Sequence, residues 1–441
     1  MPDALIDLGE MAAGGPGAEE PALPRAPLPY RWILGLLTVV LVAVLGGAAP
    51  PAPPPEPPVT LPLALRDGMW LIKDRLYLFG FADVAAGVPR DYTIRAHALP
   101  GAAPLGEYSV TLPGEMYSVT DGGDGLLLIG YQVNESGTTG VMAVRPGSGP
   151  PVWKREAMLF GAGADDSQAL VFSDVAVPGR PNRRAWQGID KRTGTTRWSV
   201  EIPVGGQFTV SNEFLWAGVP DLLYLLRPDG RLEVLDGTTG RITTATRVPA
   251  PVMDGQTYLM VASGVATVTG GGRTVAFDAR TLAPRWETPE PVTSQENFPV
   301  SCPAVLCFLH QGNGLSGLDA ATGRVLWQQQ GWDVVQPLGS RLLVSASGRP
   351  EAGLAVLDPA TGRVTARVGA WTFGGPGPEP DSAYVYRHQP VDGTLFYGVL
   401  DVTTGRTEVL GSAERVTGDC QFGPITMVCR RLDGLVSLWR L

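Results

Sequence analysis

Histidine and cysteine are scarce in this sequence. Its 441 residues include three His and four Cys, which argues against a His-rich metal centre or a zinc cluster, because such sites need several of these ligands close together. Acidic residues outnumber basic ones by 43 to 34, so the net charge is −9. A negative chain gives no electrostatic reason to bind nucleic acid, which requires a basic surface. We therefore expect neither a metal ion nor a nucleic-acid partner.

Long hydrophobic runs are also rare, and one stands out. Residues 32–49, WILGLLTVVLVAVLGGAA, contain no charged side chain, and their length lies within the range of a membrane-spanning helix. Arg25 and Arg31 precede the run and no basic residue follows it closely, so we expect residues 1–31 to be a disordered cytoplasmic tail and the rest to be extracytoplasmic. The alternative is a signal peptide cleaved near residues 46–49. The long acidic segment before the run and the prolines after it favour a retained, single-pass anchor.

Proline is concentrated directly after this run. Residues 50–62 carry eight of the 41 prolines. Each proline ring fixes φ, so we expect residues 50–64 to form an extended stalk of the polyproline II type.

From residue 65 onward long helical periodicity is absent. Short alternating runs separated by Gly, Asp, Asn and Pro indicate strands there.

A sequence motif repeats through residues 65–441, and its clearest copy is GLDAATGRVLW. Full copies occupy residues 188–198, 276–286 and 317–327. The Asp position of the motif recurs at residues 100, 145, 190, 236, 278, 319, 358 and 401. Pro100 and Arg145 replace the Asp in the first two copies. A period of about 40 residues with several strands per unit is typical of β-propeller blades, each made of four antiparallel strands.

The motif residues are suited to a tight turn between two strands. The Asp carboxylate and the Thr hydroxyl can accept bonds from backbone N–H groups, and the Gly can adopt a positive φ. We expect these turn residues to be Asp190, Thr193, Gly194, Asp236, Thr239, Gly240, Asp278, Asp319, Thr322, Gly323, Asp358, Thr361, Gly362, Asp401, Thr404 and Gly405. An aromatic residue eight positions after the Asp site would lie in the outer strand, where its ring can cover the turn and pack between blades. These docking aromatics are Tyr108, Trp153, Trp198, Trp286 and Trp327.

The pattern Asp-x-x-Thr-Gly-x-x-x-Trp after an apolar strand resembles the tryptophan-docking repeat of the pyrroloquinoline-quinone-like propellers. That superfamily includes quinoprotein alcohol dehydrogenases and BamB-like scaffold proteins. The resemblance covers residues 65–441 and implies an all-β propeller; the eight turns predict eight blades, with seven as the alternative. Two more strands, expected at residues 425–430 and 434–440, would close the ring by completing the blade of the first unit, residues 69–110, which would then be irregular.

The four cysteines allow three disulfide pairings, and an extracytoplasmic location permits disulfides. Cys307 and Cys429 each lie 12 residues before the expected end of the following strand, so we treat them as equivalent positions of the repeat. Each has an upstream neighbour, Cys302 and Cys420. Equivalence favours Cys302–Cys307 and Cys420–Cys429, each joining neighbouring strands of one blade.

Chemistry-bearing residues are few. Quinoprotein dehydrogenases carry adjacent cysteines beside the quinone and acidic and amide ligands for Ca²⁺, whereas no two cysteines are adjacent here. Residues 121–125, DGGDG, lack the fuller calcium-loop pattern, and Asp165-Asp166 is expected in a loop. His97, His310 and His388 show no spacing of ligands or of a catalytic triad. We therefore expect no catalytic, cofactor-binding or metal-binding residues, and no cofactor.

These features together predict a membrane-anchored, extracytoplasmic propeller that binds a protein or an envelope component as a non-catalytic scaffold. The alternatives are a pyrroloquinoline-quinone-dependent dehydrogenase and a ligand-sensing ectodomain. BamB-like proteins are typically lipoproteins, whereas no Cys lies near this N-terminus and we expect a helical anchor instead. The identity of the partner stays open.

Overall fold

The computed structural model describes residues 59–441 apart from residues 65, 82–88, 134–136, 163–166, 176–182, 211–217, 254–255, 290–291, 293–296, 311–313, 347–352 and 390. The expected tail and anchor, residues 1–49, and the stalk up to residue 58 lie outside the described residues. Within the part of the chain that is described, no helix has the length and apolar character needed to cross a membrane. The described residues belong to one compact unit.

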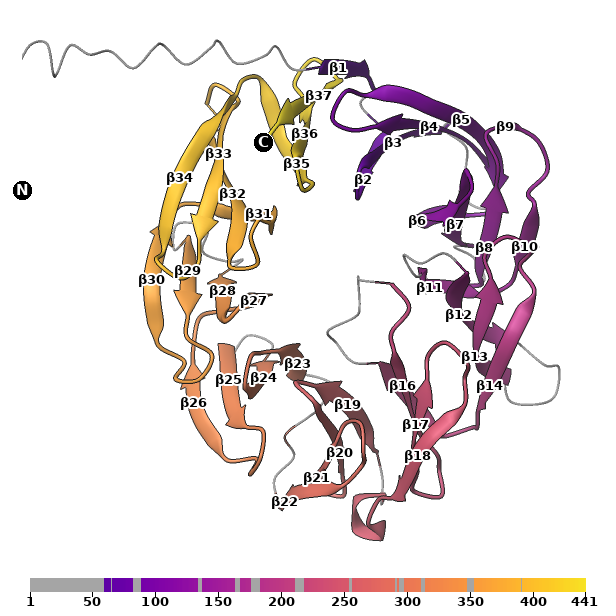
Figure 1. Ribbon diagram of the computed structural model, residues 1–441, viewed down its shortest axis with the longest axis vertical. Coiled ribbons are helices and arrows are strands. Elements are labelled where there is room, and N and C mark those ends of the chain that lie inside the picture. Colours follow the sequence, from indigo (N-terminus) through magenta and orange to yellow (C-terminus); the bar gives the residue numbers. More distant parts are fainter. Residues whose placement is uncertain are drawn as a thin grey trace, which may run out of the picture. The chain divides into compact units, whose positions relative to one another are not determined.

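The described strands form nine sheets, which follow one another around a ring as the blades of a β-propeller (Figure 1). Each blade has four strands, named A to D from the centre outward. Blade 1 consists of β2 (Gly68–Ile72), β3 (Arg75–Phe81), β4 (Arg90–Ala98) and β5 (Ala103–Leu112). Blade 2 consists of β6 (Glu115–Gly123), β7 (Leu126–Gln132), β8 (Thr139–Val144) and β10 (Trp153–Arg155). Blade 3 consists of β11 (Met158–Ala162), β12 (Gln168–Val175), β13 (Arg183–Asp190) and β14 (Thr196–Ile202).

The next three blades repeat this order. Blade 4 consists of β15 (Gln207–Val210), β16 (Leu222–Leu226), β17 (Arg231–Asp236) and β18 (Ile242–Arg247). Blade 5 consists of β19 (Tyr258–Ala262), β20 (Val265–Gly270), β21 (Arg273–Asp278) and β22 (Pro284–Thr288). Blade 6 consists of β23 (Asn297–Ser301), β24 (Val305–His310), β25 (Gly314–Asp319) and β26 (Val325–Gln329). A short 3-10 helix, η2 (Ala250–Val252), lies between blades 4 and 5.

The last three blades contain the closure. Blade 7 consists of β27 (Val334–Leu338), β28 (Arg341–Ser345), β29 (Leu354–Leu357) and β30 (Val364–Gly369). Blade 8 consists of β31 (Thr372–Pro376), β32 (Ser382–Gln389), β33 (Thr394–Asp401) and β34 (Arg406–Ala413). Blade 9 consists of β35 (Val416–Phe422), β36 (Thr426–Arg431), β37 (Leu435–Arg440) and, as its outer strand, β1 (Val59–Pro62). One further strand, β9 (Gly147–Ser148), adds to the outer edge of blade 1 in parallel with β5.

The predicted count of eight blades, and the alternative of seven, are wrong. The first unit is a complete four-stranded blade rather than an irregular one. The strands expected near residues 425–430 and 434–440 do form, as β36 and β37, but they belong to a ninth blade. Its outer strand is β1, which comes from the segment that we expected to be stalk. Counting turns missed this blade because its strand D precedes blade 1 in the chain, so no C–D turn follows β37.

Each of the nine joints between neighbouring blades contains its own buried apolar cluster. Strands B and C are covered on both sides by adjacent blades, so β20 is buried along its whole length. This explains why the central strands read as continuous apolar runs rather than as alternating ones. The outer strands are exposed on alternate residues, as in β14.

Because the strands of a blade are antiparallel, the connections fall on two faces of the ring. The A–B and C–D connections lie on one face, which we name the turn face. The B–C and D–A connections lie on the other, which we name the loop face. The repeat turns therefore all lie on the turn face, and segments that differ from blade to blade in length, such as residues 248–257 and 389–394, lie on the loop face.

Candidate functional site

The repeat turns on the turn face share one hydrogen-bond pattern. In blade 6 the Asp319 carboxylate accepts the backbone N–H groups of Ala321 at 2.8 Å and Thr322 at 2.9 Å. The N–H of Gly323 reaches the Asp319 carbonyl at 2.8 Å. Closely related carboxylate bonds occur at Asp190, Asp236, Asp278, Asp358 and Asp401. The corresponding Gly N–H to Asp carbonyl bond, also 2.8 Å long, occurs at Gly194, Gly240, Gly362 and Gly405.

These bonds lower the pKa of several turn aspartates. Hydrogen bonds from the Thr403 and Thr404 side chains bring the pKa of Asp401 down to about 2. Hydrogen bonds from backbone N–H groups lower the pKa of Asp319. The pKa of Asp190 is lowered chiefly by the hydrogen bond from the Arg197 side chain. The carboxylates are therefore charged acceptors at neutral pH and not proton donors.

The docking Trp of one blade packs against the repeat turn of the next blade. The indole N–H of Trp327 donates to the carbonyl of Pro359 at 2.8 Å, and its ring covers Gly362, where an added Cβ would lie 2.4 Å from Trp327 Cδ2. Trp153 and Trp286 contact the turn of the following blade in the same way. The Trp153 indole N–H donates to the carbonyl of Lys191 at 2.9 Å, and that of Trp286 donates to the carbonyl of Ala320 at 3.1 Å. Glycine is required at position 362 for two reasons. Its φ of 67° is unfavourable for a residue with a side chain, and the Trp327 ring occupies the place of that side chain.

Two aromatic positions depart from this arrangement. The ring of Trp198 covers Gly240, but its buried N–H makes no hydrogen bond in the described part of the chain, and Gln168 Nε2 donates to the carbonyl of Gly237 at 3.0 Å instead. Tyr108 reaches the A–B turn of blade 2, where its hydroxyl donates to the Gly125 carbonyl at 3.3 Å.

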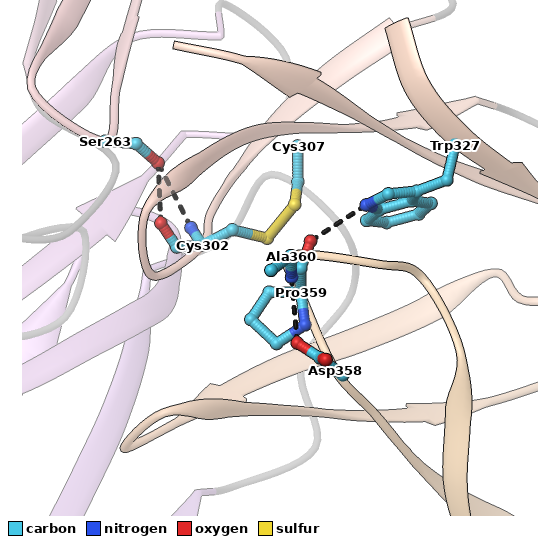
Figure 2. The surroundings of a disulfide bond; sticks show 7 residues. All are labelled: Ser263, Cys302, Cys307, Trp327, Asp358, Pro359 and Ala360. Carbon is cyan, nitrogen blue, oxygen red and sulfur yellow. Dashed lines mark hydrogen bonds between the residues drawn. A yellow bond between two sulfur atoms is a disulfide. The ribbon is translucent and has the colours of Figure 1, made fainter.

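Both predicted disulfides are present. Cys302–Cys307 closes the A–B turn of blade 6, with Cα atoms 5.9 Å apart. Figure 2 shows that it lies beside Trp327 and the Pro359 turn of blade 7. From blade 5, Ser263 Oγ accepts the N–H of Cys302 at 3.2 Å and lies 3.0 Å from its carbonyl (Figure 2). This disulfide therefore stiffens a turn that contacts both neighbouring blades.

The second disulfide, Cys420–Cys429, joins directly opposite residues of β35 and β36, with Cα atoms 4.1 Å apart. We had assumed that Cys307 and Cys429 occupy equivalent positions of the repeat, but they do not. Cys307 packs into the joint with the following blade and Cys429 into the joint with the preceding one, so they lie on opposite faces of their sheets. Counting back from the strand end failed because blade 9 has no C–D turn to fix the register.

The remaining candidates from the sequence are not brought together. His97, His310 and His388 lie in β4, β24 and β32, in three different blades. His97 and His310 make hydrogen bonds within their own blades, and His388 Nε2 lies 3.2 Å from the carbonyl of Val416 in blade 9. In the DGGDG segment, Asp121 pairs with Arg75 at 3.2 Å. Asp124 pairs with Arg192 of blade 3. Asp165-Asp166 lies outside the described residues. No group of three or more His, Cys, Asp or Glu suited to a metal ion occurs among the residues described.

A cavity of about 390 Å³ opens at the loop-face end of the joint between blades 4 and 5. Its lining consists of Gly205, Gln207, Leu226, Met253, Gln256, Thr257 and Tyr258. Gln207 crosses the joint: its amide oxygen accepts the N–H of Leu259 at 2.9 Å, and its Nε2 donates to the carbonyl of Thr257. These two bonds fix the side chain while using only one of its two N–H groups. The cavity thus combines an oriented amide with Leu, Met and Tyr side chains, a mixture typical of binding pockets.

Gln421 of blade 9 makes the same double contact with blade 1. It accepts from the N–H of Leu71 at 2.7 Å and donates to the carbonyl of Met69 at 2.9 Å. Sequence reasoning missed both glutamines because they sit at different positions of strand A and follow no repeat. The cavity was missed for a similar reason, since its lining comes from two connections and the ends of three strands, which no spacing links.

Comparison with known proteins gives one family. The family model of the outer membrane protein assembly factor BamB matches residues 118–300 and 248–370, which together span more than half of the chain. No curated protein sequence matches significantly.

Solved structures of similar fold include BamB from Moraxella catarrhalis, at 16% identity and a TM-score of 0.36, covering 74% of this chain and 96% of that one. The C-terminal WD40 domain of Sif2 aligns at 9% identity and a TM-score of 0.41, covering 87% of this chain and 97% of that one. A eukaryotic initiation factor aligns at 11% identity and a TM-score of 0.49, covering 82% of this chain and 90% of that one.

Proposed function

The chain belongs to the family of the outer membrane protein assembly factor BamB, and on that premise we propose that it is a non-catalytic scaffold that binds a protein partner through the loop face of its propeller. The partner is a protein or an envelope component of the compartment into which the propeller projects. The proposal further places the propeller outside the cytoplasm, tethered by residues 32–49.

The division of labour between the two faces supports this proposal. On the turn face, the repeat aspartates and threonines are engaged in hydrogen bonds within their own turns, and the tryptophans Trp153, Trp286 and Trp327 join neighbouring blades. The loop face carries connections that vary between blades, and variable connections on a rigid frame are where binding residues concentrate. The two disulfides are consistent with an oxidising, extracytoplasmic compartment.

The observation that carries the proposal is the cavity between blades 4 and 5. Its volume of about 390 Å³ lies within the usual range of ligand pockets, roughly 300–1,000 Å³. Val204, directly before the cavity residue Gly205, is 65% exposed. An exposed apolar residue next in sequence to the lining of a partly apolar pocket suits contact with a protein partner that inserts a side chain there.

The test is site-specific photocrosslinking in intact cells. A photoreactive amino acid replaces Val204 on the loop face or, as the matched control, Val325, which is 49% exposed beside a turn of the turn face. We expect a discrete crosslinked protein from position 204 and none from position 325. Equal crosslinking from both positions, or none from either, would contradict the assigned face.

Two further measurements address the anchor and the dehydrogenase alternative. Protease added to spheroplasts should degrade the propeller and leave residues 1–31 protected. Mature protein that starts near residue 50 would indicate a cleaved signal peptide.

Purified protein given pyrroloquinoline quinone and Ca²⁺ should show neither saturable binding nor dye reduction with alcohols or sugars. Stoichiometric quinone binding with substrate-dependent reduction would instead support the dehydrogenase.

A further inference from the structure

Arg387, on the loop face of blade 8, lies over two aromatic rings. Its guanidinium carbon lies 5.5 Å from the ring centre of Trp371 and 5.4 Å from that of Phe396. Arg387 and Phe396 are cross-strand neighbours in β32 and β33, and Trp371 directly precedes β31. Two strands and one D–A connection therefore hold the guanidinium in place.

The charge of Arg387 is not neutralised within the described part of the chain. The side chain is exposed, and no ion pair joins it to a described acidic residue. Asp392, in the same hairpin, instead accepts the backbone N–H of Thr394 at 2.9 Å. A guanidinium that lies over aromatic rings and has no ion-pair partner can donate from its N–H groups to a planar acceptor, and a carboxylate matches that geometry with two parallel bonds. The ring contacts and the unneutralised charge thus favour an anion.

Exposed apolar side chains lie on the same loop face but toward blade 9, whereas Arg387 lies on the side of blade 8 that packs against blade 7. Val391, at the tip of the same hairpin, is 94% exposed, and Leu432, in the B–C connection of blade 9, is 57% exposed. The two connections touch, because a Cβ on Gly393 would lie 2.9 Å from Leu432 Cδ1. Arginine and aromatic residues are enriched at protein interfaces. A polypeptide that crosses the tip of blade 8 can reach both Arg387 and these apolar side chains, whereas a small free anion cannot.

We propose that Arg387, held by Trp371 and Phe396, binds an Asp or Glu carboxylate of an extended partner segment whose adjacent apolar side chains cover Val391 and Leu432. This inference rests on the proposed scaffold function and names the chemistry of the partner. The aromatic stack restricts the Arg387 side chain before binding, so less conformational entropy is lost on complex formation.

The test uses a library of random dodecapeptides displayed on phage and selected on the full-length protein in detergent. We expect the selected peptides to share an Asp or Glu beside apolar residues. Synthetic versions of one selected peptide, with the acid or with the matching amide, are then titrated against the wild type and against Arg387→Gln, Arg387→Lys and Arg367→Gln. Arg367 is the matched control, because it is an exposed arginine on the outer strand of blade 7.

The acid peptide should bind wild type and Arg367→Gln at least tenfold more tightly than the amide peptide does. This ratio should fall to about one in Arg387→Gln and be intermediate in Arg387→Lys, whose ammonium cannot make two parallel bonds. Selected peptides without an acidic residue, an acid-to-amide ratio that survives in Arg387→Gln, or a failure to select any peptide would overturn the inference. A peptide that lacks an acid yet competes with crosslinking from position 204 would leave the scaffold function standing while the Arg387 site fails.

Discussion

The joint between blades 6 and 7 and the joint between blades 9 and 1 hold neighbouring sheets together by different means. At the first, Trp327 of one blade seats on the Asp358 turn of the next, burying an aromatic ring against Gly362. At the second, no docking Trp and no repeat turn take part among the described residues. The joint keeps an apolar cluster that includes Leu76 and Val436, and polar contacts add to it. β1 completes blade 9 by pairing with β37 over four residues, from Val59–Leu438 to Pro62–Leu435.

Side chains of blade 9 complete the closing joint. Gln421 binds the inner strand of blade 1, and Arg430 donates to the carbonyls of Ala64 and Asp67 in the connection between β1 and β2. The contrast teaches that the repeat is a device for joining consecutive blades. Where the chain must return to its start, non-repeating residues take over, and they are invisible to a search for repeats.

The largest effect is expected at the regular joint. Trp327→Ala removes a buried ring and leaves a void between blades 6 and 7, so it should lower the free energy of unfolding by roughly 3–5 kcal/mol, measured by denaturant unfolding followed by circular dichroism. Trp327→Phe keeps a ring and should cost clearly less. Equal losses for the two variants would show that the N–H bond to Pro359, and not the ring, holds the joint.

The second prediction separates the ring contact from backbone strain. Gly362 and Gly272 have similar φ values of 67° and 74°, but a Cβ at Gly272 would meet nothing within 4 Å. Gly272→Ala should therefore cost only the strain of a positive φ, about 1–2 kcal/mol. Gly362→Ala should cost roughly 1–3 kcal/mol more, because the new methyl group collides with Trp327. The thermal midpoints of the two variants give the comparison, and equal midpoints would contradict it.

The third prediction concerns the two glutamine clamps. Gln421→Leu and Gln207→Leu each remove one hydrogen bond to a backbone N–H and one to a carbonyl of the next blade, so each should cost about 1–3 kcal/mol. Only Gln421→Leu acts at the closing joint. It should therefore also speed amide hydrogen exchange in β1 and β37, whereas Gln207→Leu should not. Faster exchange in β1 from both variants would mean that the joints are not independent.

The smallest effect is the acid sensitivity of a single turn. The hydrogen bonds of Asp401 hold its pKa at about 2 in the folded protein, below the ordinary value near 3.9. Its contribution is complete above that ordinary value and is lost as the pH falls from about 4 through 2. Asp401→Asn should flatten the thermal midpoint against pH over this window. An unchanged slope would show that the turn carboxylate does not couple to folding.

The fold was largely predictable because its local chemistry repeats. Asp319, Thr322 and Gly323 specify a turn through their own hydrogen bonds, and Trp327 lies at a fixed offset from them. Blade number was not predictable by the same route, because the VTLP segment of β1 carries no repeat residue and pairs with strands far away in the sequence. The disulfide pairing was predicted correctly, although the repeat equivalence of Cys307 and Cys429 on which that prediction rested was wrong.

Binding residues were the least predictable part. Gln207 makes its contacts across the joint only because folding places β15 beside β19. Arg387 contacts Trp371 and Phe396 only in the folded blade. Neither arrangement leaves a periodic trace in the sequence. The repeat identifies the residues that build the frame, and the residues available for recognition are those that it leaves unexplained.

The position of β1 also sets an order of events during synthesis. Val59–Pro62 emerge from the ribosome before any other strand of the propeller, and their partner β37 follows all of them along the chain. The ring cannot close until both are present, so β37 waits with an unpaired edge only briefly, whereas β1 must stay unpaired while eight blades are made. Such long-range pairing is slow to form. The neighbouring prolines of residues 50–58 have no N–H to donate to another strand, so the ladder that β1 can offer before closure is limited to its own few residues.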